Sequence, residues 1–423
     1  MSRRILLIVA ALSIALPSGA LAQDAEQRPL SEMLGDLYVD VAFKNASAFA
    51  SVFGLPPHVV FDDFVSGRQF DVTAALNKQI AAQVTSFPLG SSAAGFTWTF
   101  VPDSGTFQRS SDSFGPTFVE RALTVGRNRF NLGVNFQRAS FDQIEGRNLG
   151  DNEIRVYTGV RSVGVFFEDS LNLKLTTDTV GIFANYGVTD HFDLGVAVPI
   201  VHVKMDATLT TRVGSSSGGV PATAQSFLTE RSGSSSGIGD IIGRAKYNFL
   251  QKPLGGLAAG VDFRFPTGNE LELTGLAGYQ SKFYVAASGS RTRVTPHANF
   301  GYTFSGESAA ASSGETFVFA PPDEWNFAGG VDVAATPRLT VVGDLVGRTL
   351  RNSFRLEPTA SEFGPAFTEF SLNEYNLRQT MGTLGFKFNP RSTALVSASV
   401  LFPINHQGLT DNLTYIVGID WAF

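Results

Sequence analysis

The sequence predicts an all-β protein, a transmembrane antiparallel β-barrel of about 14 strands (roughly 12–16) with a short helical N-terminal segment. Three observations lead to this fold class. The chain ends on a strand-like segment, it begins with a segment of the secretory type, and short connections alternate with long ones over most of its length. The predicted organisation is a signal peptide over 1–22, a helical segment over 23–85 and a barrel over 86–423.

The last nine residues alternate between apolar and small or polar side chains, which is the period of a β-strand. One face carries Tyr415, Val417, Ile419, Trp421 and Phe423, and the opposite face carries Asp420. An apolar face with aromatic ends, opposite a charge, suits a strand between lipid and a polar lumen. A terminal Phe resembles the signal by which the barrel assembly machinery recognises bacterial outer-membrane barrels, so we expect that machinery as a partner. An ordinary sandwich strand is the alternative.

Residues 1–22 have the features of a secretory signal peptide. Arg3 and Arg4 precede an apolar run of 12 residues, and Ala20 and Ala22 form a small-x-small cleavage site. The run is shorter than the ~20 residues that a spanning helix needs. The prediction is export without a helical anchor, which leaves a periplasmic protein, a secreted protein or an outer-membrane barrel.

Composition excludes several classes of function. The chain has no cysteine, so it has no disulfide, thiol nucleophile or thiolate metal site. Without Arg3 and Arg4 the mature chain keeps 30 basic and 38 acidic residues. A protein that binds nucleic acid usually carries an excess of positive charge, so this composition argues against nucleic-acid binding. The 43 glycines and 37 phenylalanines suit lipid-facing strands and close backbone approach.

Residues 23–85 differ from the rest because their apolar positions follow helical spacing. Leu30–Phe49 and Asp71–Val84 each show this spacing, and Gly54–Pro57 separates them. We expect a small helical segment on the periplasmic side or inside the barrel mouth, either as a plug or as a loose tail.

From residue 90 the chain has the pattern of successive strands. Counting from residue 117 gives 13 candidates, of which 117–126 is the first, and adding 91–101 completes an even number, as single-chain bacterial barrels have. The short connections near 126–129, 187–191, 251–254, 288–291, 336–338 and 389–392 are expected at the periplasmic end. The long ones lie near 143–165, 213–236, 268–276, 307–320, 353–372 and 405–411.

Six predicted strands place apolar side chains on one face and polar side chains on the other. The resulting lumen candidates carry charges of both signs. They are Asn131, Asn135, Arg244, Lys246, Asp262, Arg264, Asp332, Asp344, Arg348, Lys387 and Asp420. One interpretation is an internal ladder of ion pairs that fills a narrow barrel, and the other is a polar constriction along a pathway. No ring of a single sign, as an ion-selective filter would need, is apparent.

The long connections carry aromatic side chains. Residues 353–372 include Phe363 and Phe367, and 213–236 include Phe227 and Leu228. Exposed apolar groups indicate packing or binding, so these residues either pack over the barrel mouth or form a hydrophobic capture site.

Nothing in the sequence predicts a metal, cofactor or enzyme. His58, His191, His202, His297 and His406 do not stand at metal-ligand spacing, and there is no phosphate-binding loop. His406 and Asp411 share one loop, but a triad would also need a serine placed with them.

Several strand-and-turn motifs resemble the outer-membrane channel family associated with phenol meta-pathway degradation. They are Gly237–Asp240 with Arg244–Phe249, Asp262–Gly268, Gly187–Ile200 and His297–Phe304, and the resemblance extends over about 170–423. That family is distantly similar to the outer-membrane transporters of fatty acids and aromatic hydrocarbons, which are 14-stranded barrels with an N-terminal hatch.

The resemblance implies an outer-membrane channel for passive uptake of small hydrophobic or aromatic compounds. The expected partners are outer-membrane lipid, lipopolysaccharide and a small hydrophobic solute. Two alternatives stay open: a general polar-solute porin with a wide, hydrated lumen, and a sealed structural or enzymatic barrel.

Overall fold

The computed structural model describes residues 29–64, 95–101, 106–160, 164–215, 226–252, 255–276, 278–289, 293–306, 321–391 and 393–423, together with 73, 76–77, 80 and 82–84. The predicted signal peptide lies outside the described residues. Among the described residues, no helix is both long and apolar enough to cross a membrane.

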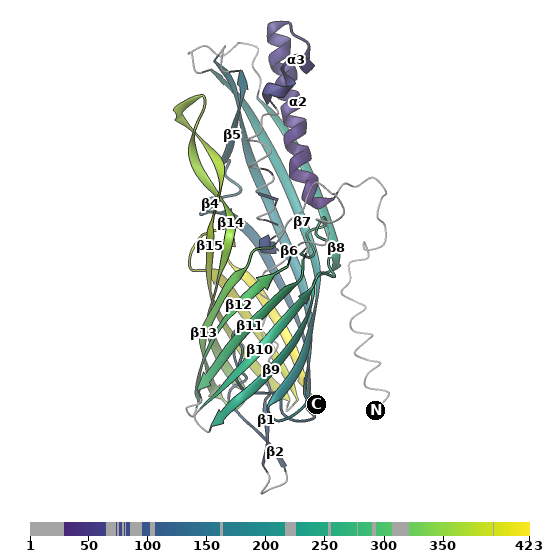
Figure 1. Cartoon of the computed structure of the whole chain (residues 1–423), viewed down its shortest axis with the longest axis vertical. Helices are drawn as coiled ribbons and strands as arrows, with labels where there is room; N and C mark the ends of the chain where they lie inside the picture. The colour runs from purple at the N-terminus through teal and green to yellow at the C-terminus, as the bar shows by residue number, and fades with distance from the viewer. Residues whose placement is uncertain are drawn as a thin grey trace.

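Twelve strands close into one antiparallel barrel, at the lower end of the predicted range (Figure 1). In spatial order they are β3 (Phe130–Ile144), β6 (Val165–Gly187), β7 (Phe192–Ser215), β9 (Ile241–Lys252), β10 (Gly255–Phe265), β11 (Gln280–Gly289), β12 (Val294–Ser305), β13 (Glu324–Thr336), β14 (Leu339–Ser361), β15 (Gly364–Arg391), β16 (Ala394–Pro403) and β18 (Thr414–Ala422). Strand β18 pairs with β3, and Phe423 exchanges backbone hydrogen bonds with Phe130 at 2.8 and 3.2 Å. The last strand therefore closes the barrel and leaves no free edge.

The short connections lie together at the end of the barrel that holds Phe423, as predicted (Figure 1). Those from β6 to β7, from β9 to β10 and from β11 to β12 join adjacent antiparallel strands, and the one near 126–129 leads into β3. In outer-membrane barrels this is the periplasmic end.

Two of the predicted strands are wrong. Among the described residues 95–101, Trp98–Val101 forms a strand, β1, which pairs with β2 (Thr106–Arg109) in a separate sheet below the barrel (Figure 1). Residues 117–126 form no strand. Side chains inside the barrel bind several of their peptide groups, such as the N–H groups of Thr117 and Phe118. These two segments account for the difference between 14 and 12.

The outward face of the barrel is a belt of exposed apolar side chains. Its upper rim carries Tyr302, Phe304, Trp325 and Tyr415, and its lower rim carries Phe130, Tyr186, Tyr247, Trp421 and Phe423. Tyr415 and Phe423 are 57% and 59% exposed, at opposite ends of one strand. A belt of this size with aromatic rims is the surface of an outer-membrane barrel in contact with lipid.

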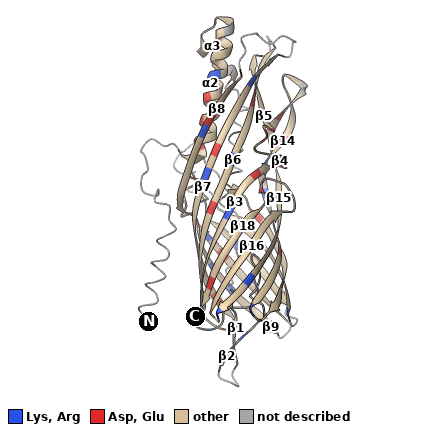
Figure 2. Cartoon of the chain, turned by 180° about the vertical axis from the view of Figure 1, so that it is seen from behind, with Lys and Arg blue, Asp and Glu red and all other residues tan. Residues whose placement is uncertain are grey.

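Strands β6 and β7 continue far beyond the belt. They have 23 and 24 residues, about twice the ~10 needed to cross a bilayer. Together with β5 (Ile154–Val160) and β8 (Phe227–Ile238) they form a sheet above the barrel, which we call the extension (Figure 1). The outer face of its strands carries charges of alternating sign, including Lys204 and Asp206 at 3.2 Å (Figure 2). This face therefore lies in water, outside the lipid.

The N-terminal helices pack on the extension, at the far end from Phe423 (Figure 1). They are α2 (Met33–Phe53), preceded by the 3-10 turn η1 (Leu30–Glu32), and α3 (Pro57–Phe64). Gly54 ends α2 with φ 65°, a left-handed conformation that glycine adopts readily. The helical prediction for Leu30–Phe49 is therefore confirmed, but its placement on the periplasmic side is wrong.

Several predicted loops are instead strands. Residues 353–372 form the top of the β14–β15 hairpin, and β8 occupies most of the second half of 213–236. β4 (Arg147–Asn148) and β17 (Leu409–Asp411) are short additions beside β3.

An apolar interior runs from the extension to the barrel mouth. Its buried members include Leu34, Leu37 and Val41 of α2, Leu171 and Leu173 of β6, Val203 and Met205 of β7, Leu76, Ile80 and Val84, and Leu409 near the mouth. Leu76 and Ile80 show that part of the second predicted helical pattern lies inside the molecule.

One buried carboxylate lies where α2 meets the extension. Asp169 accepts hydrogen bonds from Thr211 Oγ1 at 2.6 Å and from Asn45 Nδ2 at 3.0 Å. Burial raises the pKa of Asp169 to about 7, from a reference value of 3.8. The packed state therefore binds a proton more tightly than the state in which α2 has left the sheet.

This pKa predicts that α2 packs more tightly in acid. The raised pKa gives the packed state an advantage that is complete below the reference pKa and is lost as the pH rises toward about 7. Amide hydrogen exchange of residues 34–41, corrected for intrinsic rate, should be slower at pH 5 than at pH 8 by about tenfold or more. Asp169→Asn should remove this difference, and Asp178→Asn on the outer face of β6 should keep it. Equal pH dependence in both variants would contradict the assignment.

Candidate permeation site in the barrel lumen

The predicted lumen candidates lie on the inward faces of their strands, and four of them, Arg244, Lys246, Asp344 and Lys387, bind a segment of the same chain. That segment, residues 110–128, lies inside the barrel without forming a strand, and we call it the luminal segment. Its side chains include the fully buried Phe114, Val119, Arg121 and Ala122. The sequence analysis missed it, because it took 117–126 for a wall strand.

The upper half of the luminal segment is bound by the β14–β15 wall. Asp344 Oδ2 accepts the backbone N–H groups of Thr117 and Phe118 at 2.8 and 2.9 Å. Lys387 Nζ donates to Pro116 O at 2.7 Å. Each of these bonds involves a charged group, so each contributes about 1.5–3 kcal/mol to holding the segment.

The lower half is bound by β9 and its neighbours. Lys246 Nζ donates to the carbonyl oxygens of Arg121 and Leu123 at 3.1 and 3.0 Å. Asp193 accepts the N–H of Val125 at 3.0 Å. A segment with no strand partner must satisfy its peptide groups in some other way, and the inward side chains do so here.

Glycines in the luminal segment were the sequence signal that could have revealed it. Gly115 and Gly126 have φ angles of 77° and 101°, outside the range of a strand. A Cβ on Gly115 would lie 2.5 Å from the Arg121 guanidinium carbon. The chain therefore turns where a wall strand would continue straight.

A serine, a histidine and an aspartate meet beneath the luminal segment. His297 bonds Asp332 through Nε2 and Ser288 Oγ through Nδ1, the latter at 3.0 Å. Because the Asp332 carboxylate only accepts, His297 Nε2 carries a proton toward it. Ser288 Oγ also accepts the N–H of Ala122 at 2.9 Å, and all three side chains are buried. The arrangement therefore holds the luminal segment and presents no open nucleophile.

Other candidates have local roles. Asn131 Nδ2 donates to Phe96 O at 3.2 Å, and Asn135 Oδ1 accepts the N–H of Gly181 at 3.2 Å. Asp420 lies on the inward face of β18 and would contact any side chain placed at Gly133. Among the described residues, no group of three His, Asp or Glu side chains gathers as a metal site would require.

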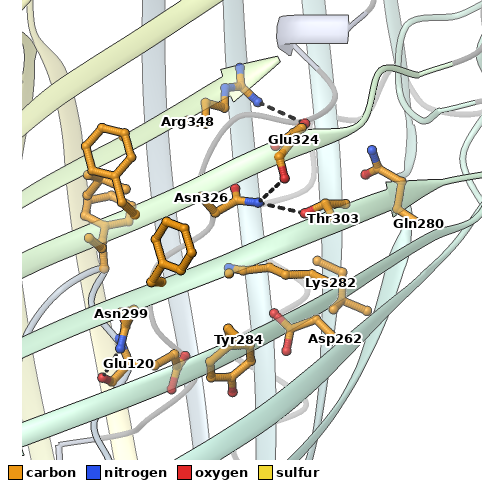
Figure 3. Close-up of a pocket in the computed structure, with 18 of the residues that line it drawn as sticks. Glu120, Asp262, Gln280, Lys282, Tyr284, Asn299, Thr303, Glu324, Asn326 and Arg348 are labelled. Atoms are coloured by element: carbon orange, nitrogen blue, oxygen red, sulfur yellow. Dashed lines mark hydrogen bonds and ion pairs between the residues drawn. The ribbon is translucent and has the colours of Figure 1, made fainter. Parts of the chain in front are cut away.

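A cavity of about 170 Å³ remains between the luminal segment and the wall from β9 to β15 (Figure 3). The predicted candidates that line it are Arg244, Asp262, Arg264 and Arg348. Other side chains at the cavity, which the sequence analysis did not select, are Glu120, Gln280, Lys282, Tyr284, Asn299, Thr303, Glu324 and Asn326. The lining of the cavity therefore combines apolar side chains with charges of both signs, and its charged residues form no ring of one sign.

A second cavity of about 20 Å³ lies beyond the first and shares Glu120, Arg244 and Tyr284 with it. Arg244 Nη1 lies 3.4 Å from Glu120 Oε1, and Arg244 Nε lies 3.6 Å from Asp262 Oδ1. An ion pair between wall and luminal segment therefore separates the two spaces.

The aromatic candidates lie apart from this polar lumen. Phe363 and Phe367 at the top of the β14–β15 hairpin contact Phe166, with ring centroids 5.6 and 4.7 Å apart. Phe367 also contacts Tyr157 at 5.6 Å. The hairpin tip thus packs across to the extension, and its two phenylalanines keep part of their surface exposed.

Comparison with known proteins gives one family match. Residues 171–352 match the model described as "Putative MetA-pathway of phenol degradation". The matched range begins where the predicted resemblance begins and stops before the β14–β15 hairpin tip. No curated protein matches the chain.

Comparison with solved structures finds matches of low sequence identity. An outer membrane channel from Pseudomonas putida F1 is 12% identical, with 71% of this chain and 98% of that chain covered and a TM-score of 0.46. The toluene transporter of Ralstonia pickettii is 11% identical, with coverages of 81% and 99% and a TM-score of 0.37. A Pseudomonas aeruginosa FadL homologue is 13% identical, with coverages of 70% and 89% and a TM-score of 0.32. Over residues 171–352, the match to the phenol MetA-pathway family model confirms the resemblance predicted from the strand-and-turn motifs.

Proposed function

We propose that this barrel is an outer-membrane channel for passive uptake of small hydrophobic or aromatic compounds. The observation that carries this proposal is the apolar interior between the extension and the barrel mouth, which includes Leu37, Leu173 and Leu409. A solute that passes along this interior must replace contacts between apolar side chains. An apolar solute can do so, whereas a hydrated sugar or ion would lose its water without compensation.

The narrow lumen supports a selective channel over a general porin. A general porin needs a continuous water-filled passage, and among the described residues the luminal segment borders two separate cavities of about 170 and 20 Å³. A solute therefore moves from the first cavity to the second when the luminal segment shifts and the Glu120–Arg244 pair opens. The concentration gradient alone sets the direction.

The test is uptake of radiolabelled toluene by cells that carry or lack the gene. Toluene is the cargo that the Ralstonia pickettii structure names, and we propose the same class of solute here. We expect faster initial uptake with the gene. Identical uptake curves over a range of low concentrations would refute the proposal, and a large steady conductance in planar bilayers would favour the porin alternative.

Weakening the attachment of the luminal segment should open the lumen. Asp344→Ala removes the acceptor of two backbone N–H groups, so the segment should leave its position more often. Single-channel recording should then show open events several times more frequent than in the unmodified protein. Asp206→Asn, a carboxylate change on the outer face of β7, is the matched control and should leave conductance unchanged. Equal conductance in all three proteins would mean that Asp344 does not hold the lumen closed.

The aromatic hairpin tip should contribute to capture at low solute concentration. Replacing Phe363 and Phe367 with Ser removes partly exposed rings that contact Phe166. We expect the half-saturating toluene concentration to rise several-fold while the maximal rate stays similar. Tyr375→Ser, an exposed ring lower on β15, is the control. Unchanged half-saturation in the double variant would assign these rings to packing alone.

A further inference from the structure

We propose that the first luminal cavity binds an aromatic carboxylate, a single ring carrying one negative charge, and that Lys282 holds its carboxylate group. This inference rests on the proposed function and narrows its solute from aromatic compounds in general to aromatic acids.

The charges around the cavity do not balance. Its lining has four cations, Arg244, Arg264, Lys282 and Arg348, and three carboxylates, Glu120, Asp262 and Glu324. With these groups ionised, the lining has one more positive than negative charge, while Arg264 is also attracted to the Asp240 carboxylate outside the lining. In a partly enclosed space of low dielectric, such an excess favours the entry of one anion.

Two of the arginines already have carboxylate or amide partners. Arg244 lies between Glu120 and Asp262, at 3.4 and 3.6 Å. Arg348 donates to Gln379 Oε1 at 2.9 Å through Nε and lies 3.9 Å from Glu324. The positive charges of Arg244 and Arg348 are therefore already paired with other side chains.

Lys282 differs from them. Within the described residues, no carboxylate oxygen lies within 4.0 Å of its nitrogen. Its cross-strand neighbour on β10 is Asp262, whose carboxylate faces Arg244. The Lys282 ammonium instead lies 5.4 Å from the centre of the Tyr284 ring. Figure 3 shows its side chain extending into the open space, with Asn326 on one side and Tyr284 on the other.

The remainder of the cavity suits an aromatic ring. Phe118 of the luminal segment and Tyr284 of β11 supply aromatic surfaces, and Ile242 and Met381 supply apolar ones. At about 170 Å³ the cavity is smaller than the roughly 300 Å³ at which pockets for drug-sized ligands begin. It therefore has room for one ring with a small substituent.

The apolar interior above the cavity acts as a second filter. A fully hydrophilic anion such as phosphate would lose its hydration against Leu173 and Leu409 before it reached Lys282. An aromatic acid has a ring for that interior and a carboxylate for the lysine. The two regions together thus select an amphipathic anion.

The test compares benzoate with benzyl alcohol, which has similar size and no charge. Titration calorimetry on the full chain in detergent at pH 7 should show benzoate binding that Lys282→Met weakens about tenfold, the value of one charge-assisted hydrogen bond. Lys282→Arg should keep most of the affinity, which separates loss of charge from loss of folding. Lys204→Met, on the outer face of β7, should bind benzoate like the unmodified protein.

Uptake by cells separates failure of this inference from failure of the proposed function. If the unmodified gene speeds uptake of both labelled solutes and Lys282→Met slows only benzoate, the inference holds. If the gene speeds benzyl alcohol uptake but benzoate does not enter, or enters equally fast in Lys282→Met, the inference is overturned and the proposed function stands. If the gene speeds uptake of neither solute, both are overturned.

Discussion

The backbone N–H and C=O groups of the luminal segment need hydrogen-bond partners, yet the strands of the surrounding barrel already pair with one another. The barrel wall has no free edge to offer, because β18 closes onto β3. The inward side chains therefore supply the partners, and they do so with charged groups such as Asp344, Lys387 and Lys246. This requirement explains why a narrow barrel contains so many ionisable residues and why both signs occur.

The same strands serve two solvents, because successive side chains point to opposite faces. Outside, the belt from Tyr415 to Phe423 contacts lipid. Inside, Asp420 and its counterparts on other strands face the polar lumen. Above the belt the pattern is reversed. There the outer face of the strands is charged, and the inner face, on which α2 packs, is apolar. A solute entering from the extension thus meets apolar surface first and charge second.

The period-two pattern predicted the barrel, the belt and the inward position of every polar candidate, because burial on one face imposes that period directly. It could not distinguish a wall strand from the luminal segment, since Thr117 and Phe118 are partnered by a carboxylate that lies 226 residues or more away in the chain. The hairpin tip with Phe363 and Phe367 was predicted as a loop, whereas in the structure the chain folds back there and pairs with its own continuation. Lys282 was not predicted, although it shares the inward face with Gln280 and Tyr284. The cavity, and the absence of a carboxylate within 4.0 Å among the described residues, distinguish it.

The central claim is that the luminal segment closes the pathway and must move for a solute to pass. The chain has no cysteine, so a single engineered pair can test this directly. Thr117 Oγ1 and Ser399 Oγ lie 3.4 Å apart, which places Thr117→Cys and Ser399→Cys within reach of a disulfide. Uptake of a labelled aromatic solute should stop when this pair is oxidised and return when it is reduced. Undiminished uptake through the oxidised, cross-linked protein would contradict the account.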